Sequence, residues 1–95
     1  PLVQPRFDAD YLKNPAPAYP PLSRRMGEEG KVILRVLVSA QGSAESVEVR
    51  TSSGSQRLDD AAVNTVKNWK FIPAKRGDTA VQSSVLVPII FKLEQ

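Results

Sequence analysis

A proline interrupts the most strand-like run of this sequence and limits where that strand can lie. The run is SSVLVPIIFKL, residues 83–93, and it contains Pro88. Proline has no backbone N–H to donate to a sheet ladder, so a strand that carries it lies at a sheet edge or at a bulge. An edge strand is also a template for pairing with another chain. The position of Pro88 therefore bears on function as well as on fold.

Two further segments alternate apolar and polar residues with the period of a β-strand. Residues 31–39 place four apolar side chains on one face, and residues 44–51 place Val47 and Val49 inward between charged neighbours. Gly42 lies between the two segments, where it can adopt the positive φ angle of a tight reversal. The pattern predicts an antiparallel hairpin.

The period changes to that of an amphipathic helix over residues 55–69. Ser55 is in position to cap this helix, and Asp59 in its early turns suits the helix dipole, although we expect it to lie away from the apolar stripe. The stripe consists of Leu58, Ala62, Val66 and Trp69. This helix is expected to lie across the hairpin.

The amino-terminal part is rich in proline. Residues 1–18 contain four prolines, so we expect an extended arm that forms the end of a linker, with the domain itself spanning residues 19–95. Two more prolines precede the helical stretch 22–26, and Gly27 follows it. This arrangement predicts one or two turns of helix.

The order of these elements predicts an α+β domain. Its sheet has three antiparallel strands with a helix packed on one face, and a short amino-terminal helix precedes it. The first hairpin strand is the longer and more apolar of the pair, so it belongs in the centre, and the spatial order is second, first, third. The strand that contains Pro88 then lies on an outer edge. The expected core includes Val36, Leu58, Ala62, Trp69, Phe71 and Phe91.

Composition weakens most enzymatic interpretations. The 95 residues make one domain, which can bury roughly 60 to 65% of its unfolded surface. The absence of cysteine and histidine removes disulfides, thiolate chemistry and the commonest general base and metal ligand. The adjacent acidic pairs, 28–29 and 59–60, lack convergent partners for hydrolysis or metal binding. We therefore expect no enzyme, no cofactor and no metal.

Two function classes stay open beside a protein-binding role. The net charge of +3 and the pI of 9.5 are compatible with a small basic nucleic-acid-binding module, in which Trp69, Phe71 and Phe91 would stack on bases. The lack of a basic stripe and of outward aromatic residues argues against it. The other class is a weak enzyme or a protein with a small-ligand pocket. The sequence argues against it, because it has no histidine, no cysteine and no phosphate-binding glycine loop.

Four stretches between residues 14 and 93 carry a further signal: NPAPAYPPLSRR, GEEGKVILRVLVSAQGSAESVEV, SSGSQRLDDAAVNTVKNWKFIPAK and VPIIFKL. Together, in this order, they resemble the carboxy-terminal periplasmic domain of TonB-type energy transducers. The resemblance implies a protein anchored in the inner membrane of a Gram-negative envelope. It receives work from a proton-driven motor complex there and serves outer-membrane transporters of iron carriers, haem or cobalamin. Another envelope-spanning protein of similar shape is the alternative within this class.

The resemblance also implies how the partner binds. In this family a short extended segment of the transporter is added as a strand to the sheet edge, and a loop with a Tyr-Pro pair touches it. Here that loop contains Tyr19, with Ala16 at a position that is often polar and Asn14 as a candidate substitute. The predicted peptide-binding residues are Ser84, Val85, Leu86, Val87, Pro88, Ile89 and Ile90, with Asn14, Ala16 and Tyr19 from the loop.

The proline also predicts a direction for the backbone groups of the edge. Neighbouring residues of a strand alternate in the side to which their N–H and C=O groups point. If Pro88 faces outward, Leu86 and Ile90 offer their backbone groups to an incoming strand, and Val87 and Ile89 bond to the central strand. The same edge predicts that copies of the chain can pair with each other. Because the sequence opens at proline, with no membrane-spanning stretch or secretory signal, we expect an excised domain.

Overall fold

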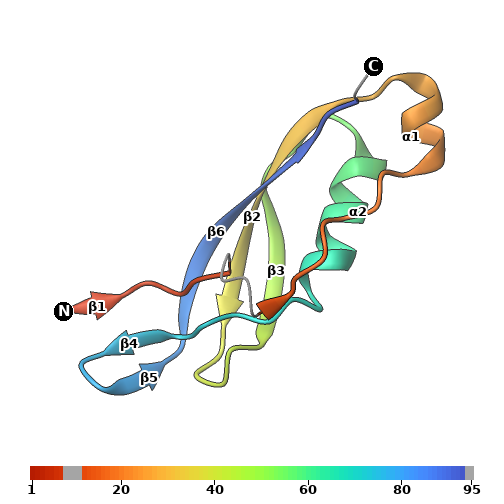
Figure 1. Ribbon diagram of the computed structural model, residues 1–95. Helices are drawn as coiled ribbons and strands as arrows, with labels where there is room; N and C mark the ends of the chain where they lie inside the picture. Colours follow the sequence, from red (N-terminus) through yellow and green to blue (C-terminus); the bar gives the residue numbers. More distant parts are fainter. Residues whose placement is uncertain (8–11, 94–95) are drawn as a thin grey trace.

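A three-stranded antiparallel sheet crossed by one long helix forms the centre of the molecule (Figure 1). The computed structural model describes residues 1–7 and 12–93. The strands of this sheet are β2 (Gly30–Val38), β3 (Ala44–Thr51) and β6 (Ser83–Phe91). Their order is β3-β2-β6, so the predicted arrangement is confirmed, and the strand that contains Pro88 lies at an edge.

A second, smaller sheet was not predicted from the sequence. It consists of β1 (Leu2–Val3), β4 (Ala74–Arg76) and β5 (Thr79–Val81) in the order β1-β4-β5. β4 and β5 form a hairpin whose two-residue turn begins at Gly77, with a φ angle of 62°. A Gly-Asp pair between short strands is a hairpin signal, and it stands at residues 77–78 of this sequence.

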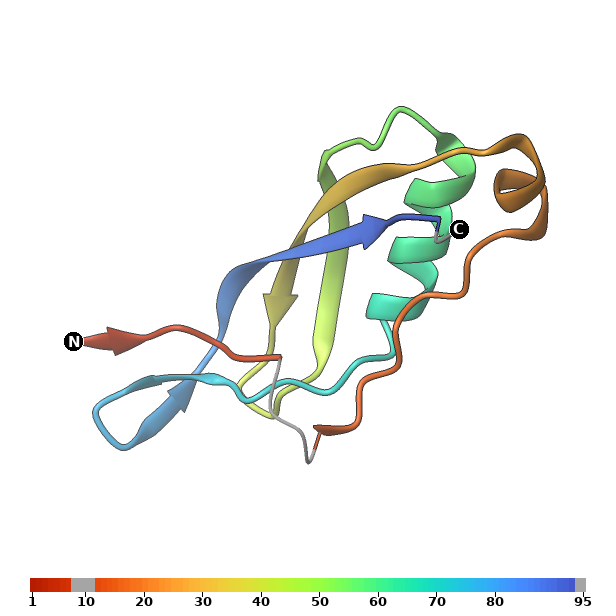
Figure 2. The same cartoon turned by 45° about the horizontal axis from the view of Figure 1, so that its top comes forward.

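The amino-terminal segment packs on the domain instead of extending away from it (Figure 2). Besides the β1–β4 pairing, Arg6 and Ile72 exchange two backbone hydrogen bonds of 3.0 and 2.8 Å. The ring of Phe7 stacks on Trp69 with 6.1 Å between ring centroids. The described residues of the proline-rich arm are thus part of the folded unit, and the boundary between residues 18 and 19 stays a prediction.

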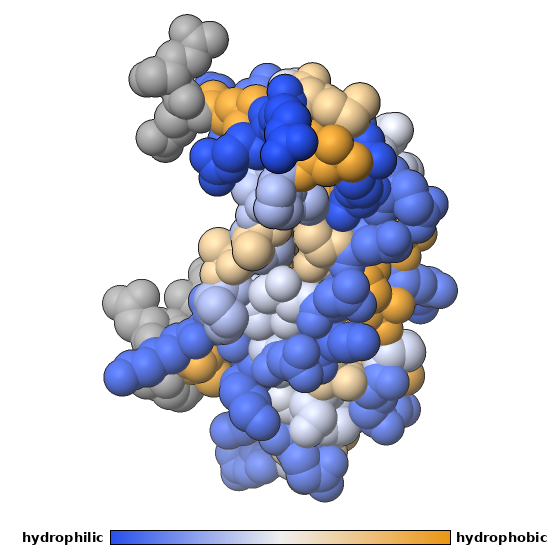
Figure 3. Space-filling model, turned by 90° about the vertical axis from the view of Figure 1, so that its right-hand side faces the viewer, coloured by the Kyte–Doolittle hydropathy of each residue, from blue (hydrophilic) through white to orange (hydrophobic). Residues whose placement is uncertain are grey.

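The short helix α1 (Pro21–Met26) forms as predicted, with Pro21 at its first position. Gly27 ends it in the left-handed conformation, with a φ angle of 72°, and the N–H groups of Gly27 and Glu28 close the last turn. Hydrophobic residues gather at the α1 end of the molecule, where Leu22 and Met26 are exposed (Figure 3). None of the helices in the described part of the chain has the length and apolar character needed to cross a bilayer.

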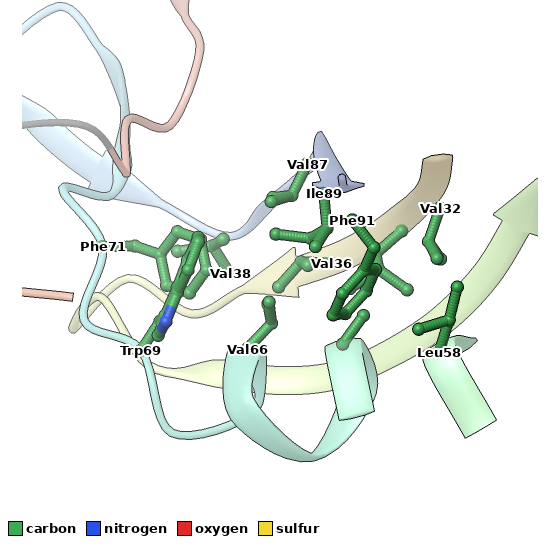
Figure 4. Close-up of a cluster of buried hydrophobic side chains, with 12 residues drawn as sticks. Val32, Val36, Val38, Leu58, Val66, Trp69, Phe71, Val87, Ile89 and Phe91 are labelled. Carbon is green, nitrogen blue, oxygen red and sulfur yellow. The ribbon is translucent and has the colours of Figure 1, made fainter. Parts of the chain in front are cut away.

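The core lies between the sheet and α2 (Gln56–Val66), which begins at the predicted cap, where the Ser55 hydroxyl accepts a hydrogen bond from the N–H of Leu58. Side chains from β2, β6 and α2 meet there with the aromatic residues that follow the helix (Figure 4). All six residues expected in the core are at most 9% exposed: Val36, Leu58, Ala62, Trp69, Phe71 and Phe91. Burial of these aromatic rings leaves none of the three as a platform for stacking on bases.

Asp59 was expected on the solvent side of α2, and this prediction is wrong because the carboxylate is buried. It accepts hydrogen bonds from the Ser52 hydroxyl and from the Ser53 N–H and hydroxyl, the last two at 3.0 and 2.7 Å. Burial alone would raise the pKa of Asp59, but these bonds outweigh it and lower the pKa. The helical periodicity of the sequence does not show that the preceding turn, with Ser52 and Ser53, folds over the start of α2 and covers Asp59.

Val49 was expected in the core, and this prediction is also wrong because the side chain is 40% exposed. It pairs with Leu34 next to a register shift in which β3 inserts Arg50 as an extra residue. Such a bulge bends and twists an edge strand. Val47, in the regular part of the ladder, packs against the core, and Val49 does not.

Replacing Trp69 with alanine should destabilise the fold by about 3 to 5 kcal/mol, because a large buried aromatic ring leaves a cavity. The loss includes the hydrogen bond of 2.7 Å from the indole N–H to the carbonyl of Pro15. Denaturant unfolding of Trp69→Ala measures the change. A variant that kept its melting temperature but lost peptide binding would show that Trp69 contacts a ligand.

Replacing Asp59 with asparagine should cost about 1.5 to 3 kcal/mol at neutral pH, the range for hydrogen bonds to a charged group. Because folding lowers the pKa of Asp59, its stabilising effect is present above the unfolded pKa, about 3.9, and is lost as pH falls through the folded value. Urea unfolding should therefore show a difference between the two proteins at pH 7 that shrinks below about pH 4. A difference independent of pH would contradict a role for the charge.

Candidate functional site

One long side of β6 is unpaired in the described part of the chain. On its other side, all nine residues of β6 pair with β2, from Ser83 opposite Val38 to Phe91 opposite Gly30. Among the strands of residues 1–7 and 12–93, only β2 is hydrogen-bonded to β6. In Figures 1 and 2, the amino-terminal segment passes the beginning of β6. Most of the length of β6 has no neighbour on its outer side in these views. β6 is therefore an edge at which a further strand can be added.

The side chains of β6 divide between the two faces of the sheet. Val87 and Ile89 are buried against the core, so a partner can reach only their backbone. Leu86 and Ile90 are 45% and 69% exposed on the face opposite α2, with the exposed Pro88 between them. Ser84 and Val85, at the beginning of the strand, are half-buried. The edge thus presents an apolar outer surface of three side chains.

Pro88 lies opposite Ile33 in the ladder between β6 and β2. An edge strand accommodates proline without loss of a ladder bond only if the proline nitrogen faces away from the neighbouring strand. The placement of Pro88 at this edge agrees with the direction that we predict for the backbone groups of Leu86 and Ile90. That direction stays a prediction.

Tyr19 is the loop residue that packs against β6. Its ring meets Phe91 edge-on with 5.4 Å between centroids, and its hydroxyl donates a hydrogen bond to the carbonyl of Glu28. The guanidinium of Arg24 lies 5.3 Å from the ring centroid. Burial, and then the charge of Glu29, raise the pKa of Tyr19, and Arg24 opposes them. Tyr19 therefore ties the loop to the carboxy-terminal end of the edge.

Asn14 lies elsewhere and holds the loop to the fold. Its side-chain amide donates to the carbonyl of Lys70 at 2.7 Å and accepts from the N–H of Lys70 at 2.7 Å. A third bond of 3.1 Å runs to the carbonyl of Phe7. Lys70 bridges to Ser43 near the β2–β3 turn, at the end of β2 remote from Phe91. A role for Asn14 in peptide binding stays a prediction and would compete with these bonds.

Ala16 is exposed in the same loop and offers no side-chain donor or acceptor. The loop runs along α2 from the Asn14 end to the Tyr19 end (Figure 2). The structure thus brings Tyr19 to the edge strand, while Asn14 contacts the segment that follows α2. Peptide contacts of Ala16 also stay a prediction.

An ion pair that the sequence did not suggest joins the end of α1 to the start of α2. The carboxylate of Glu28 lies 3.1 Å from the Arg57 guanidinium and accepts a bond of 3.2 Å from the Ser55 hydroxyl. The hydroxyl of the buried Ser23 lies near this carboxylate without a hydrogen bond of normal geometry. The Ser23 hydroxyl, and then Arg57 and Ser55, lower the pKa of Glu28. These contacts support the segment that carries the acceptor of Tyr19.

A shallow cavity at the beginning of the edge was also missed at the sequence level. It has a volume of about 470 Å³ and is lined by Gln4, Arg35, Arg50, Ser84, Val85 and Leu86. The alternation of residues 31–39 and 44–51 had placed both arginines on outward faces, but nothing in the sequence joined them to β6. The described residues contain no cluster of three or more side chains suited to a metal ion.

Comparisons with known proteins agree on one family. A family model described as Gram-negative bacterial TonB protein C-terminal matches residues 15–93. The chain is 56% identical over 89 residues to Protein tonB2 of Pseudomonas aeruginosa, an alignment that covers 94% of this chain and 33% of that protein. It is 37% identical over 78 residues to Protein TonB of Vibrio cholerae, covering 82% and 32%. The chain thus spans about one third of the length of these relatives.

Solved structures show the same fold. The solution structure of the Pseudomonas aeruginosa TonB carboxy-terminal domain superposes with a TM-score of 0.67 at 25% sequence identity, covering 86% of this chain and 83% of that one. The corresponding domain of Helicobacter pylori gives a TM-score of 0.65 at 24% identity, covering 87% and 72%.

Replacing Tyr19 with phenylalanine should lower the free energy of unfolding, because it removes the hydrogen bond to the carbonyl of Glu28 and keeps the ring. Tyr19→Ala should cost more, since it also removes the contacts with Phe91 and Arg24. Chemical unfolding of both variants measures the two contributions. Equal stability of Tyr19→Phe and the parent protein would show that the bond to Glu28 contributes nothing to the anchor.

Proposed function

The chain belongs to the family of Gram-negative bacterial TonB protein carboxy-terminal domains, and from this premise we propose that it is the partner-binding end of an energy transducer. Its partners are outer-membrane transporters, from which it binds a short extended segment as an added strand. The domain works in the periplasm as part of an inner-membrane-anchored protein and performs no catalysis. The work that it transmits comes from a proton-driven motor complex and serves uptake of iron carriers, haem or cobalamin.

The unpaired side of β6 is the observation that carries this proposal. Strand addition requires a sheet edge with free backbone groups, and pockets or apolar side chains beside it give selectivity. β6 has nine residues fully paired on its inner side, with Leu86 and Ile90 exposed along the outer face. The anchored Tyr19 stands at the carboxy-terminal end of this edge. An incoming strand would lie beside residues 84–90.

The expected affinity is moderate. Each added backbone hydrogen bond contributes about 0.5 to 1.5 kcal/mol net. Ordering a flexible segment offsets much of the sum of these bonds. Burial of Leu86 and Ile90 against apolar side chains of the partner adds to binding. Such an interaction forms and dissociates readily, as a transducer that serves repeated transport cycles requires.

The geometry of the edge also suits the transmission of force. A segment added to β6 would bond to a strand that is itself paired along its whole length with the central strand. Tension directed along these strands loads many parallel hydrogen bonds together. The added strand can therefore bear load that single weak bonds would not bear.

Titration of the isotope-labelled domain with synthetic peptides tests the proposal. The peptides are copied from the amino-terminal segments of outer-membrane transporters of the source bacterium. Backbone amide shifts should cluster at residues 84–90. Shifts that cluster on the edge formed by Glu45–Arg50, with residues 84–90 silent, would refute the assignment of the binding edge.

Replacing Leu86 with proline should weaken peptide binding roughly fivefold, because it removes one outward N–H donor worth about 1 kcal/mol. Leu86→Ala is the matched control, since it removes the same side chain and keeps the donor. The difference in dissociation constant between these two variants isolates the backbone bond. Equal affinities, with both variants folded, would show that the N–H of Leu86 does not face the partner.

A further inference from the structure

The cavity beside the first residues of β6 is positively charged. It lies on the sheet face opposite α2, where Arg35 on β2 pairs with Leu86 on β6. Both Arg35 and Arg50 line it, together with the hydroxyl-bearing Ser84 and the side chain of Gln4. All four polar side chains can donate hydrogen bonds. No carboxylate is among the lining residues.

The two arginines are only weakly engaged within the domain. The guanidinium of Arg35 lies 3.8 Å from Glu48, and these side chains are 56% and 67% exposed, so water screens the pair. Arg50 is the residue that the β3 bulge inserts, and bulges commonly redirect a side chain. Within the described residues, no carboxylate lies within ion-pair distance of Arg50. Both guanidiniums are therefore available to an added anion.

We propose that this cavity binds the carboxylate of an aspartate or glutamate side chain carried by the strand that pairs with β6. The inference rests on the proposed function, because the ligand reaches the cavity only as part of the added strand. It goes beyond that function in two ways. It assigns a preference for negative charge to one end of the bound segment, and it assigns Arg35 and Arg50 as the residues that cause this preference.

The spacing of strands in a sheet permits this contact. Neighbouring strands lie about 4.8 Å apart, so an added strand lies about 9.6 Å from β2. Residues of the added strand opposite Ser84 or Leu86 project to the same face as these side chains. A carboxylate there and the long side chain of Arg35 extend toward each other over β6. A guanidinium can then donate two parallel hydrogen bonds to the carboxylate.

The proposal predicts selection by charge at a defined place. An acidic residue next to the beginning of β6 would be favoured, and a lysine there would be repelled by both guanidiniums. At the other end of the edge, Ile90 pairs with Lys31. None of the residues that line the cavity lies at that end. The preference should therefore depend on the position of the acid within the segment.

Synthetic nine-residue peptides of threonine and valine, which favour extended structure, provide the probes. One set carries a single aspartate at successive positions, and a matched set carries asparagine at the same positions. At the position opposite Ser84 or Leu86, the aspartate peptide should bind roughly three- to tenfold more tightly than its asparagine counterpart. This ratio should fall toward one as salt rises, because the pair is partly exposed.

Charge variants of the domain assign the effect to the cavity. Arg50→Gln and Arg35→Gln should each reduce the ratio between the two peptides and leave the asparagine peptide bound as before. Glu48→Gln should increase the ratio, because it removes a carboxylate that competes for Arg35. Lys31→Gln is the matched control, since it removes one positive charge from the same sheet face at the far end of the edge.

The outcomes separate this inference from the proposed function. If neither peptide shifts the amides of residues 84–90, the proposed function fails. If both peptides shift them and the ratio is unchanged in Arg35→Gln and Arg50→Gln, strand addition stands and the carboxylate site is overturned. A loss in Lys31→Gln equal to that in Arg50→Gln would also overturn it, because the effect would then reflect net charge alone.

Discussion

The pairing of β2 on both of its sides is the interaction on which the rest of the structure depends. Val32, Val36 and Val38 are fully buried beneath α2, and the backbone of the same strand holds β3 on one side and β6 on the other. Because β2 pairs with β6 over nine residues, the inner side of β6 is held in place and only its outer side is left for a further strand. The edge that we propose for partner binding is thus positioned by the most buried strand of the domain.

Much of this fold could be predicted because it depends on local periodicity. The alternation in the three strands, the helical stripe, Ser55 as a cap and Gly27 as a helix end all appear in the sequence as short-range patterns, and proline fixed the edge assignment of β6. The patterns failed where distant residues decide the outcome. The serines that bury Asp59 lie in a preceding turn, and the bulge that exposes Val49 depends on the register with β2. Arg50 illustrates the same limit at the candidate site, since its place beside β6 follows from the sheet and not from its neighbours in sequence.

The amino-terminal arm shows why composition misleads for a segment rich in proline. Extended backbone is what proline favours, but extended backbone can also lie along a folded surface and bond to it. Here Arg6 bonds to Ile72, Phe7 stacks on Trp69, and the indole of Trp69 bonds in turn to Pro15. Tryptophan is therefore both a core residue and the point at which two parts of the arm are held. A role for Trp69 in stacking on a ligand would require an exposed ring. The arm and α2 together cover this ring.

Pro88 has a further consequence for the choice between a partner and a second copy of the domain. Where position 88 turns toward the open side, as we propose, a transporter segment that pairs with β6 lacks one hydrogen bond. Two copies of the domain paired through the same edge would each contribute a proline, and the shared ladder would lack two. At about 1 kcal/mol for each missing bond, self-association is disfavoured roughly fivefold more than partner binding. Pro88 thus leaves the edge of β6 open to other proteins and makes pairing with the same edge of a second copy less favourable.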